Sequence, residues 1–471
     1  MTGTVNKGTF MIDRRRARRR TRARSGVAIV FVVVVALVAG ACSGNRSTAK
    51  PATTSPSGST GATSSSVVDT STCPTQNDTT GVNGDTITIG TSVAQSGTYA
   101  PFSAILDGEQ AYLDYTNAQG GVEVAGKKYK IKLVAKDDAY VASKTVTNVQ
   151  SLLTDDKVFA LFNVVGTKNN LAIRDLVNRE CVPDLFAASG ATQWGNHEFP
   201  WLIGSELVPY PLEVKRFVEY LKATKPDATI ALLKANDDFG QSYADTLTQL
   251  VKGTQLKIVK TEQYDSTGAE VDTQVNNLAS TKADVFFLAA ALLACPAALS
   301  AAANAGWHPI IYMSGTCVSK VLFSVAGPAA DKVFSVTPLL DPADPKNAND
   351  PAMKLYKAQV AKYKPKADLL DGIVGYGWTT GALLVKTLES AKKLDRGSVM
   401  EAARTLKDVS GVGLQIPAAK WNTSADDWFI GETFQFVQWD ATAGHTNPVA
   451  GGLTDDDGKT AELTPEELIN Q

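Results

Sequence analysis

The sequence contains few of the residues and motifs on which enzyme chemistry depends. Its 471 residues include only 3 histidines and 5 cysteines, and no GxSxG, HExxH, Walker A or GxGxxG motif occurs in it. It has no CxxC pair, and His197, His308 and His445 are scattered, which argues against a structural zinc site. No histidine accompanies a candidate nucleophile, so covalent catalysis has no visible machinery. We therefore expect a protein that is not an enzyme and holds no cofactor or metal.

Two short stretches resemble known motifs but lack the neighbouring residues that those motifs require. Asp237-Asp238-Phe239-Gly240 contains the letters DFG, without the HRD motif or glycine loop that a kinase also needs. Asp455-Asp456-Asp457-Gly458 resembles a calcium loop, but Leu453 stands at the first ligand position and Thr464 at the last. We interpret the second stretch as a solvated turn.

The formal net charge of −2 is the sum of two segments of opposite charge. Residues 1–41 hold nine basic residues and one acidic residue, a net charge of +8. Residues 42–471 hold 37 basic and 47 acidic residues, a net charge of −10. Binding to DNA or RNA depends on Lys and Arg that neutralise phosphates, so an acidic body of this kind excludes nucleic acid as a general partner.

The N-terminus has the organisation of an export signal. The apolar run Val27–Ala39 follows the arginine cluster and is shorter than the roughly 20 residues of a membrane span. Ala39-Gly40-Ala41-Cys42 then resembles the bacterial lipobox, in which the cysteine receives diacylglycerol, although Ala39 stands where Leu is commoner. We predict a signal peptide at 1–41 and lipidation at Cys42. The alternative is an uncleaved membrane anchor with an incidental cysteine.

Residues 42–72 consist mainly of Ser, Thr, Ala, Gly and Pro. Such a segment cannot bury enough surface to offset the entropy lost on ordering. We predict a flexible, lipid-anchored tether, which places the protein outside the cytoplasm on the outer face of the cell membrane. The folded body is then expected to begin at residue 73.

The body alternates short apolar runs with amphipathic stretches. Ala142, Val146, Val149 and Leu153, for example, have the spacing of one helix face. Apolar runs without polar alternation, separated by helices, are typical of parallel strands covered on both faces. Two such series predict an α/β fold of two doubly wound parallel-sheet lobes. The predicted strands lie at 86–90, 129–134, 158–162, 185–188, 229–233, near 258, at 284–290 and at 309–313.

Ligands of doubly wound sheets bind outside the carboxyl ends of the strands. This rule selects a set of six loops as the candidate binding site: 94–102, 163–170, 188–192, 235–240, 291–295 and 314–317.

Four cysteines remain after Cys42, and an even number in an exported protein favours two disulfides. Four cysteines permit three pairings. We prefer Cys295–Cys317, because both residues follow neighbouring predicted strands. The second pair is then Cys73–Cys181, since Cys181 precedes a strand at the opposite end of its lobe, where the chain enters the domain.

Several stretches together resemble a known family. Ala94-Gln95-Ser96-Gly97, Asn117 to Val122, Lys136-Asp137-Asp138, Asn236 to Gly240, Ala305-Gly306 and Tyr376 to Ala382 occur in the order and spacing of type I periplasmic binding proteins. The similarity covers about 83–445 and is greatest to the leucine/isoleucine/valine-binding group of ABC-transporter substrate-binding proteins. It implies two lobes joined by a three-strand hinge and closing on a ligand. By this resemblance, lobe 1 comprises 73–207 and 337–416, and lobe 2 comprises 208–336 and 417–471.

The resemblance also implies which residues bind the ligand. Hydroxyl and backbone N–H groups of lobe 1 would hold a carboxylate, and an aromatic residue of the first loop would cover the ligand. Lobe 2 would contribute apolar side chains, and one aromatic residue lies near the hinge. By position, the implied ligand-binding residues are Phe102, Thr167, Ala188, Ser189, Gly190, Phe239, Leu292, Thr316 and Tyr376.

Three departures from the family pattern concern the ligand and the disulfides. The acidic residue that faces an amino-acid ammonium in the family falls near Thr316, which carries no charge. A buried ammonium without a carboxylate is costly, which argues against an ordinary α-amino acid. Leu292 and Leu293 replace lobe-2 aromatics, and Tyr140 and Gly166 stand where the usual disulfide lies.

These observations predict a monomeric lipoprotein that binds a small amphipathic solute, amino-acid-like, carboxylate or amide, for the permease of an ABC importer. An acid or amide group would be held by Thr167 and Ser189, with the apolar part against Phe102, Phe239 and Leu292. A sensory lipoprotein of the same fold, without a permease, is a second hypothesis. An extracellular hydrolase is a third, for which the sequence offers no catalytic constellation.

Overall fold

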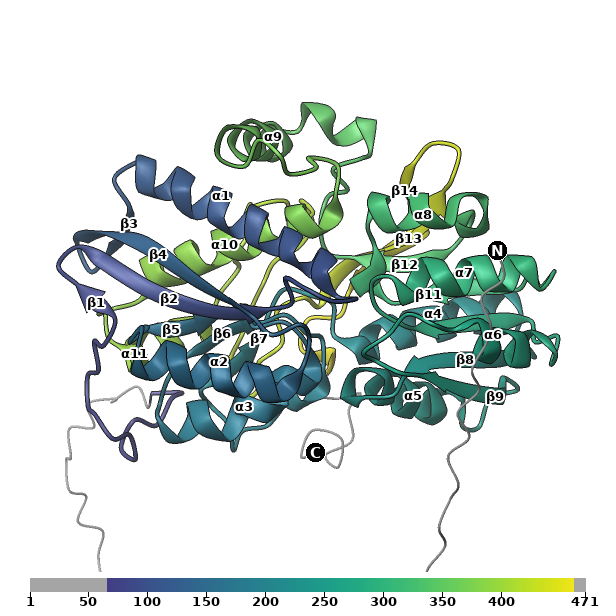
Figure 1. The fold of residues 1–471 in the computed structure, drawn as a ribbon, viewed down its shortest axis with the longest axis horizontal. Coiled ribbons are helices and arrows are strands. Elements are labelled where there is room, and N and C mark those ends of the chain that lie inside the picture. The colour runs from purple at the N-terminus through teal and green to yellow at the C-terminus, as the bar shows by residue number, and fades with distance from the viewer. Residues whose placement is uncertain (1–65, 461–471) are drawn as a thin grey trace, which may run out of the picture. The chain divides into compact units, whose positions relative to one another are not determined.

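The computed structural model describes residues 66–460, which form two separate β-sheets flanked by helices (Figure 1). The predicted signal peptide, Cys42 and the tether up to residue 65 lie outside the described residues. None of the helices between residues 66 and 460 is both long and apolar enough to cross a membrane. The helices are α1 Ala104–Ala118, α2 Ala142–Thr154, α3 Thr167–Arg179, α4 Tyr210–Thr224, α5 Asp238–Val251, α6 Asp272–Ala279, α7 Ala294–Asn304, α8 Lys320–Ala326, α9 Pro351–Tyr363, α10 Gly372–Ser390 and α11 Arg396–Ala403.

The first sheet has the strand order β3-β4-β2-β5-β6-β7, with β1 added beside β2. The strands β4, β2, β5, β6 and β7 pair in parallel, whereas β3 pairs antiparallel with β4 at one edge and β1 pairs antiparallel with the start of β2. Helices α1 and α10 lie on one side of this sheet and α2 and α3 on the other (Figure 1). Its strands are β1 Val82–Asn83, β2 Thr86–Val93, β3 Val122–Val124, β4 Lys127–Asp137, β5 Ala160–Phe162, β6 Asp184–Ala187 and β7 Leu202–Gly204.

The second sheet repeats this topology in the order β14-β13-β12-β11-β10-β8-β9. The strands β9, β8, β10, β11 and β12 pair in parallel. In both sheets the parallel strand that comes first in the chain lies between the second and the third: β2 lies between β4 and β5, and β8 lies between β9 and β10. This confirms the predicted fold class of two mostly parallel, doubly wound sheets. The strands are β8 Thr229–Ala235, β9 Lys257–Tyr264, β10 Val285–Ala289, β11 Ile310–Met313, β12 Phe334–Thr337, β13 Thr433–Asp440 and β14 His445–Asp455.

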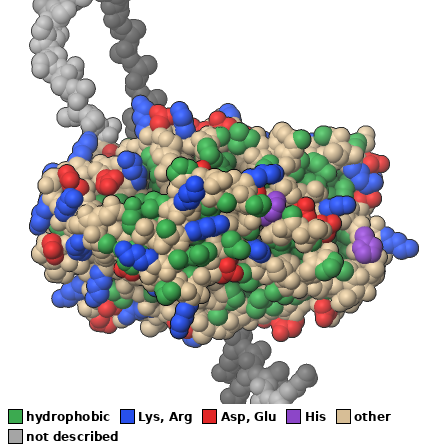
Figure 2. All heavy atoms as spheres, turned by 90° about the horizontal axis from the view of Figure 1, so that it is seen from above, with side chains coloured by type: hydrophobic (Ala, Val, Ile, Leu, Met, Phe, Trp, Pro, Cys, Tyr) green, Lys and Arg blue, Asp and Glu red, His purple; other side chains and the backbone are tan. Residues whose placement is uncertain are grey.

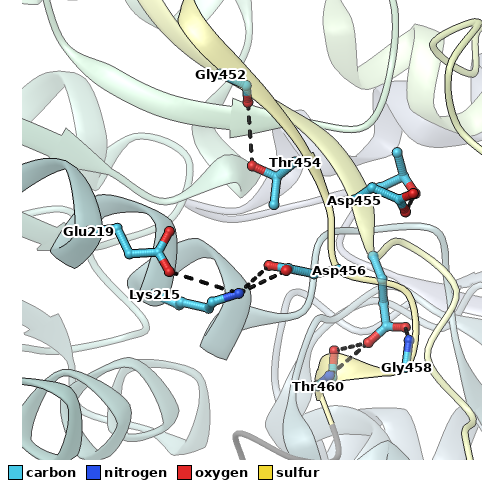
Figure 3. Close-up of polar contacts among 10 residues, drawn as sticks. Lys215, Glu219, Gly452, Thr454, Asp455, Asp456, Gly458 and Thr460 are labelled. Carbon is cyan, nitrogen blue, oxygen red and sulfur yellow. Dashed lines mark hydrogen bonds and ion pairs between the residues drawn. The ribbon is translucent and has the colours of Figure 1, made fainter.

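The antiparallel pair β13 and β14 was not among the predicted strands. It extends the second sheet beyond β12, with Val336 opposite Phe436. The end of β14 is tied to α4, because Lys215 Nζ lies 2.8 Å from both carboxylate oxygens of Asp456 and 3.9 Å from Glu219 (Figure 3). Asp455 accepts a hydrogen bond from Thr433. The aspartates that resemble a calcium loop therefore anchor the end of the sheet.

The chain passes three times between the two sheets. It leaves β7 for α4, returns after β12 to the helices α9 to α11, and passes back before β13. Two of these passages pair through backbone hydrogen bonds. The Leu340 N–H donates to the Leu414 carbonyl, and the Ile416 N–H donates to the Pro338 carbonyl. The arrangement fits the expected three-strand hinge, and the residue limits of the two lobes stay a prediction.

The last residues of the predicted tether pack against the folded body. The Glu401 carboxylate on α11 accepts hydrogen bonds from the Ser66 hydroxyl and from the backbone N–H groups of Val67 and Val68. Val68 is buried in the core. These contacts fix the chain several residues before the expected start of the body at residue 73.

The structure contains both cysteine pairs that the sequence predicts. Cys73 is bonded to Cys181, with Cα atoms 5.6 Å apart, and Cys295 to Cys317, with Cα atoms 6.5 Å apart. The first bond joins the start of the described chain to the turn between α3 and β6. The second joins the first turn of α7, which follows β10, to the turn that follows the neighbouring strand β11.

Helices α1 and α10 approach until their backbones touch. A Cβ atom added to Gly108 would lie 2.1 Å from the Val374 carbonyl oxygen, and one added to Gly377 would lie 2.0 Å from that of Ile105. Neither glycine has space for a side chain, so the crossing depends on both. Because α1 and α10 also carry residues of the candidate site, this contact helps to position it.

We expect Gly108→Ala to lower the free energy of unfolding by about 2 kcal/mol or more, because the added methyl group meets backbone atoms that cannot rotate away. Chemical denaturation followed by circular dichroism measures the change. Asp114→Ala on the same helix is the control and should change the value by less than about 0.5 kcal/mol. Equal stability of Gly108→Ala and the wild type would show that the helices separate without cost.

Candidate functional site

All six loops selected from the sequence meet at one cavity between the two sheets. The cavity encloses about 620 Å³ of empty space, part of it open to solvent. Loops of the first sheet, loops of the second sheet and α10 all line it, so it lies at the carboxyl ends of both sets of strands, as the topology rule requires. Its lining residues are Phe102, Ile105, Tyr140, Val165, Gly166, Thr167, Ala188, Leu207, Tyr210, Phe239, Ala291, Gly315, Thr316, Val318, Gly372, Ile373 and Tyr376.

The Thr167 hydroxyl forms the polar end of this cavity, with the Ser189 hydroxyl directly behind it. Thr167 is the first residue of α3, and its Oγ1 lies 2.8 Å from Ser189 Oγ. Ser189 Oγ also accepts hydrogen bonds from the Ala191 N–H and, at 3.4 Å, from the Tyr210 hydroxyl. The N-terminus of α3 adds unpaired N–H groups and a positive dipole end, which favour a negatively charged or carbonyl oxygen here.

A glycine and an aromatic ring occupy the positions of the family's usual disulfide in the first lobe. Gly166 has a φ angle of +106°, and a Cβ atom there would lie 2.6 Å from Tyr140 Cε2. Tyr140 stacks on Tyr99, with ring centroids 4.2 Å apart, and Tyr99 lies beside Phe102. A packed aromatic cluster therefore stands where the sequence lacks the two cysteines.

The opposite wall contains aromatic residues of the second-sheet side. The Phe239 ring lies edge-on to Tyr210 and Tyr243, with centroids 5.3 Å from each. At the hinge, the Tyr376 hydroxyl donates to Ser205 and accepts from Asn163 Nδ2. Tyr376 thus connects α10 with the loop after β5 and with the passage that leads to α4.

Not every residue implied by the resemblance lines the cavity. Phe102, Thr167, Ala188, Phe239, Thr316 and Tyr376 do. Ser189 is buried directly behind Thr167, and Gly190 packs against the Val208 carbonyl and the Tyr210 ring. Leu292 is fully buried and turned away by a φ angle of +46°, and its neighbour Ala291 lines the cavity instead. The roles of all nine in ligand binding stay predictions.

The sequence profile of the family described as "Periplasmic binding protein" matches residues 86–445, most of the chain and all of the candidate cavity. The chain belongs to the periplasmic binding protein family. The periplasmic binding protein family expected from the sequence is confirmed by this match, and solved structures of a leucine-binding protein and of a valine-bound protein share the fold. The family is one of exported solute-binding proteins rather than enzymes.

Three solved structures illustrate the similarity. A fatty acid ABC transporter substrate-binding protein from Thermomonospora curvata is 21% identical, with a TM-score of 0.69 over 81% of this chain and 95% of that one. A branched-chain amino acid ABC transporter protein from Thermus thermophilus with bound valine is 17% identical, with a TM-score of 0.68 over 78% and 96%. A leucine-binding protein from Thermotoga maritima is 15% identical, with a TM-score of 0.65 over 79% and 99%. At these identities the likeness concerns the fold.

Lys168 joins the two sides of this periplasmic binding protein outside the cavity. The residue lies in the first turn of α3, and its Nζ donates to Ser266 at 3.0 Å and lies 3.8 Å from the Asp237 carboxylate. Asp237 caps the N-terminus of α5. Nζ also lies 4.5 Å from the centre of the Tyr140 ring. A residue directly after Thr167 therefore holds the second-sheet side over the polar end of the cavity.

A buried acid near Thr316 was not predicted. Glu213 on α4 accepts hydrogen bonds from the Tyr312 hydroxyl at 2.6 Å and from the Gly315 N–H at 3.0 Å, and it is 2% exposed. Burial raises its pKa to about 7, against the effect of these donors. No sequence pattern indicates a buried role for Glu213, because a single acid in an amphipathic helix is usually solvated.

One group among the described residues has the composition of a cation site. Ligand oxygens of Asp427, Glu432 and Asp457 lie within 4.8 Å of one another. Glu432, however, already accepts hydrogen bonds from the Gly458 and Thr460 N–H groups and from the Thr460 hydroxyl. Burial, followed by the nearby Asp427, raises the pKa of Glu432 to about 8. The group stabilises the chain after β14 and lies apart from the residues of the cavity.

The surface carries charges of both signs. On the face drawn in Figure 2, Lys and Arg side chains are interspersed with Asp and Glu and separated by apolar and neutral groups. This face does not present the continuous basic surface that nucleic acid would require.

The raised pKa of Glu213 makes the stability of the protein depend on pH. The carboxyl binds its proton more tightly in the folded than in the unfolded chain, so its stabilising contribution is complete below about pH 4.5 and is lost as pH rises through about 7. We expect Glu213→Gln to reduce the fall in the free energy of unfolding between about pH 4.5 and 7 by up to about 3 kcal/mol. The glutamine oxygen can still accept both hydrogen bonds.

Urea unfolding of both proteins between pH 4.5 and 8 measures this difference. Burial also raises the pKa values of Asp184 and Glu206 to about 7, and both remain in the variant. The variant should therefore show a shallower decline, not a flat profile. An identical pH dependence in the two proteins would contradict the raised pKa of Glu213.

Proposed function

We propose that the chain is the lipid-anchored solute receptor of an ABC importer and binds a small amphipathic acid or amide between its two sheets. The observation that carries the proposal is the cavity itself, with the Thr167 hydroxyl, backed by that of Ser189, at one end and mostly apolar walls elsewhere. A carboxylate or carboxamide matches the polar end, and an apolar body matches Phe102, Ile105 and Phe239. The solute is bound without covalent change and passed to permease subunits by a monomeric receptor.

The charge of the cavity supports a solute without an ammonium group. Thr316 lines the cavity where the family resemblance implies an acid, and Glu213 lies behind Gly315 with both of its hydrogen bonds made inside the protein. A buried ammonium needs a carboxylate partner to offset its desolvation. The similar proteins named above include one for a fatty acid and one with bound valine, so both chemistries occur on this fold.

Closure of the lobes follows from the same contacts. A bound solute touches both sides of the cavity and therefore favours the form in which Lys168 meets Asp237 and Ser266. Closure excludes water from the Thr167 end, which strengthens hydrogen bonds to the solute. The closed form is what a permease would recognise.

We expect Thr167→Ala to weaken binding roughly 10- to 100-fold, because a hydrogen bond to a charged group contributes about 1.5–3 kcal/mol. Calorimetry of the purified full-length protein with hexanoate, hexanamide, leucine and norleucine measures the effect. Thr147→Ala, at an exposed position of α2, is the matched control and should bind like the wild type. Unchanged affinity of Thr167→Ala would remove Thr167 from the site.

Lipidation is tested separately at Cys42. Cells fed labelled palmitate should incorporate label into the wild type and into Ser43→Ala, and not into Cys42→Ala, because only the cysteine sulfur accepts diacylglycerol. Mass spectrometry of the labelled protein should place its N-terminus at Cys42. Label in Cys42→Ala, or a retained segment 1–41 in the wild type, would favour the uncleaved anchor.

A further inference from the structure

A second cavity, which we call the annex, adjoins the candidate binding cavity at the hinge. It encloses about 770 Å³ of empty space, part of it open to solvent. Leu207, Tyr210, Thr316, Val318 and Tyr376 line both cavities. We call these shared residues the neck, because they lie at the boundary between the two cavities.

The annex lies on the side of the neck away from the polar end. Thr167, Phe102 and Phe239 line only the first cavity. Leu339 and Leu414, which line only the annex, belong to the paired hinge passages. The order along the combined space is therefore hydroxyl groups, aromatic walls, neck and annex.

The wall of the annex is mainly apolar. Val336, Leu339, Leu340, Pro342, Leu414 and Trp439 contribute to it. Such a surface gains free energy when it covers an aliphatic chain and cannot compensate a buried polar group.

Most polar side chains of the annex are already satisfied by the protein. The Asp341 carboxylate accepts hydrogen bonds from Ala343 and from Thr446, through both its N–H and its hydroxyl. The Ser319 hydroxyl donates to Asp371, and Glu213 is held by Tyr312 and Gly315. Lys320 adds a positive charge to the lining.

We propose that the annex binds the tail of the solute, and that the solute is an unbranched aliphatic monocarboxylic acid, or its amide, longer than a branched-chain amino acid. The head group lies at Thr167, the first methylenes lie between Phe102 and Phe239, and the rest of the chain passes the neck to Leu340. The inference rests on the proposed function and names its substrate class. Residues of the hinge thereby set the preferred chain length.

The test begins with a chain-length series on the wild-type protein. Calorimetry with butanoate, hexanoate, octanoate and decanoate should show affinity rising about fourfold for each added methylene, up to the length that fills the annex. Affinity that stops rising at hexanoate, or falls beyond it, would overturn the annex proposal. Leucine or hexanamide binding in that case would leave the proposed function intact, whereas absence of binding by every compound would overturn both.

A variant whose side chain fills the annex distinguishes binding of the tail in the annex from a general preference for hydrophobic ligands. Leu340 is partly exposed and lines only the annex, so Leu340→Trp should weaken decanoate binding at least tenfold and leave butanoate unchanged. Leu340→Ile is the matched control and should keep the wild-type series. If thermal unfolding shows that Leu340→Trp is not folded, Leu340→Phe is the smaller replacement. Equal weakening of butanoate and decanoate would contradict the inference.

A matched pair of ligands tests the charge of Lys320. Octanoate should bind more tightly than suberate, which has the same carbon chain and a second carboxylate that the annex wall would have to bury. Tighter binding of suberate, lost in Lys320→Ala, would instead assign the annex to a second carboxylate and overturn the aliphatic tail.

Discussion

The arrangement of the site depends on the backbone contact between α1 and α10. Gly108 and Gly377 remove the side chains that would keep the two helices apart, so Ile105 at the start of α1 and Tyr376 on α10 reach the same cavity wall. The two helices come from segments more than 200 residues apart in the sequence. The Tyr376 hydroxyl then fixes the loop after β5 and the passage to α4 through Asn163 and Ser205. The geometry of the hinge therefore depends on how the helices of the first sheet pack against each other.

The parallel sheets explain why the cavity has a polar and an apolar part. Strands covered by helices on both faces leave only their ends open, and the N-terminus of α3 at one such end brings unpaired N–H groups together with Thr167. The walls further in are made by helix residues and hinge segments, which are apolar because they also belong to the core. Lys168, one residue after Thr167, places the interlobe contact directly over the polar end. In the proposed function, binding of a head group and closure over it would therefore involve the same turn of α3.

Most of the fold and the location of the site could be predicted from the sequence, because both depend on periodic patterns. Apolar runs identified eight of the strands from β2 to β11 but missed β3 and β7, and strand ends then identified the six loops that line the cavity. Side-chain direction within a loop could not be predicted. Leu292 adopts a positive φ angle and turns into the core, and Ala291 takes its place at the cavity. Glu213 comes to Gly315 from a different helix, and only tertiary structure reveals that proximity.

Thr316 stands where the resemblance implies an acid, and Glu213 is the nearby carboxylate that could replace it. Glu213 lines the annex but not the candidate binding cavity, and its Oε2 is held by the Tyr312 hydroxyl and the Gly315 N–H, so turning this oxygen toward Thr316 would leave both donors unpaired. Each buried donor left without a partner costs about 1–3 kcal/mol. Burial has also raised the Glu213 pKa to about 7, so near neutral pH the group is only partly ionised and a weak counter-ion for an ammonium. The structure therefore favours a solute whose only polar group is the head at Thr167. In the proposed binding mode, the neck at Thr316 would then hold methylenes, which need no charged partner.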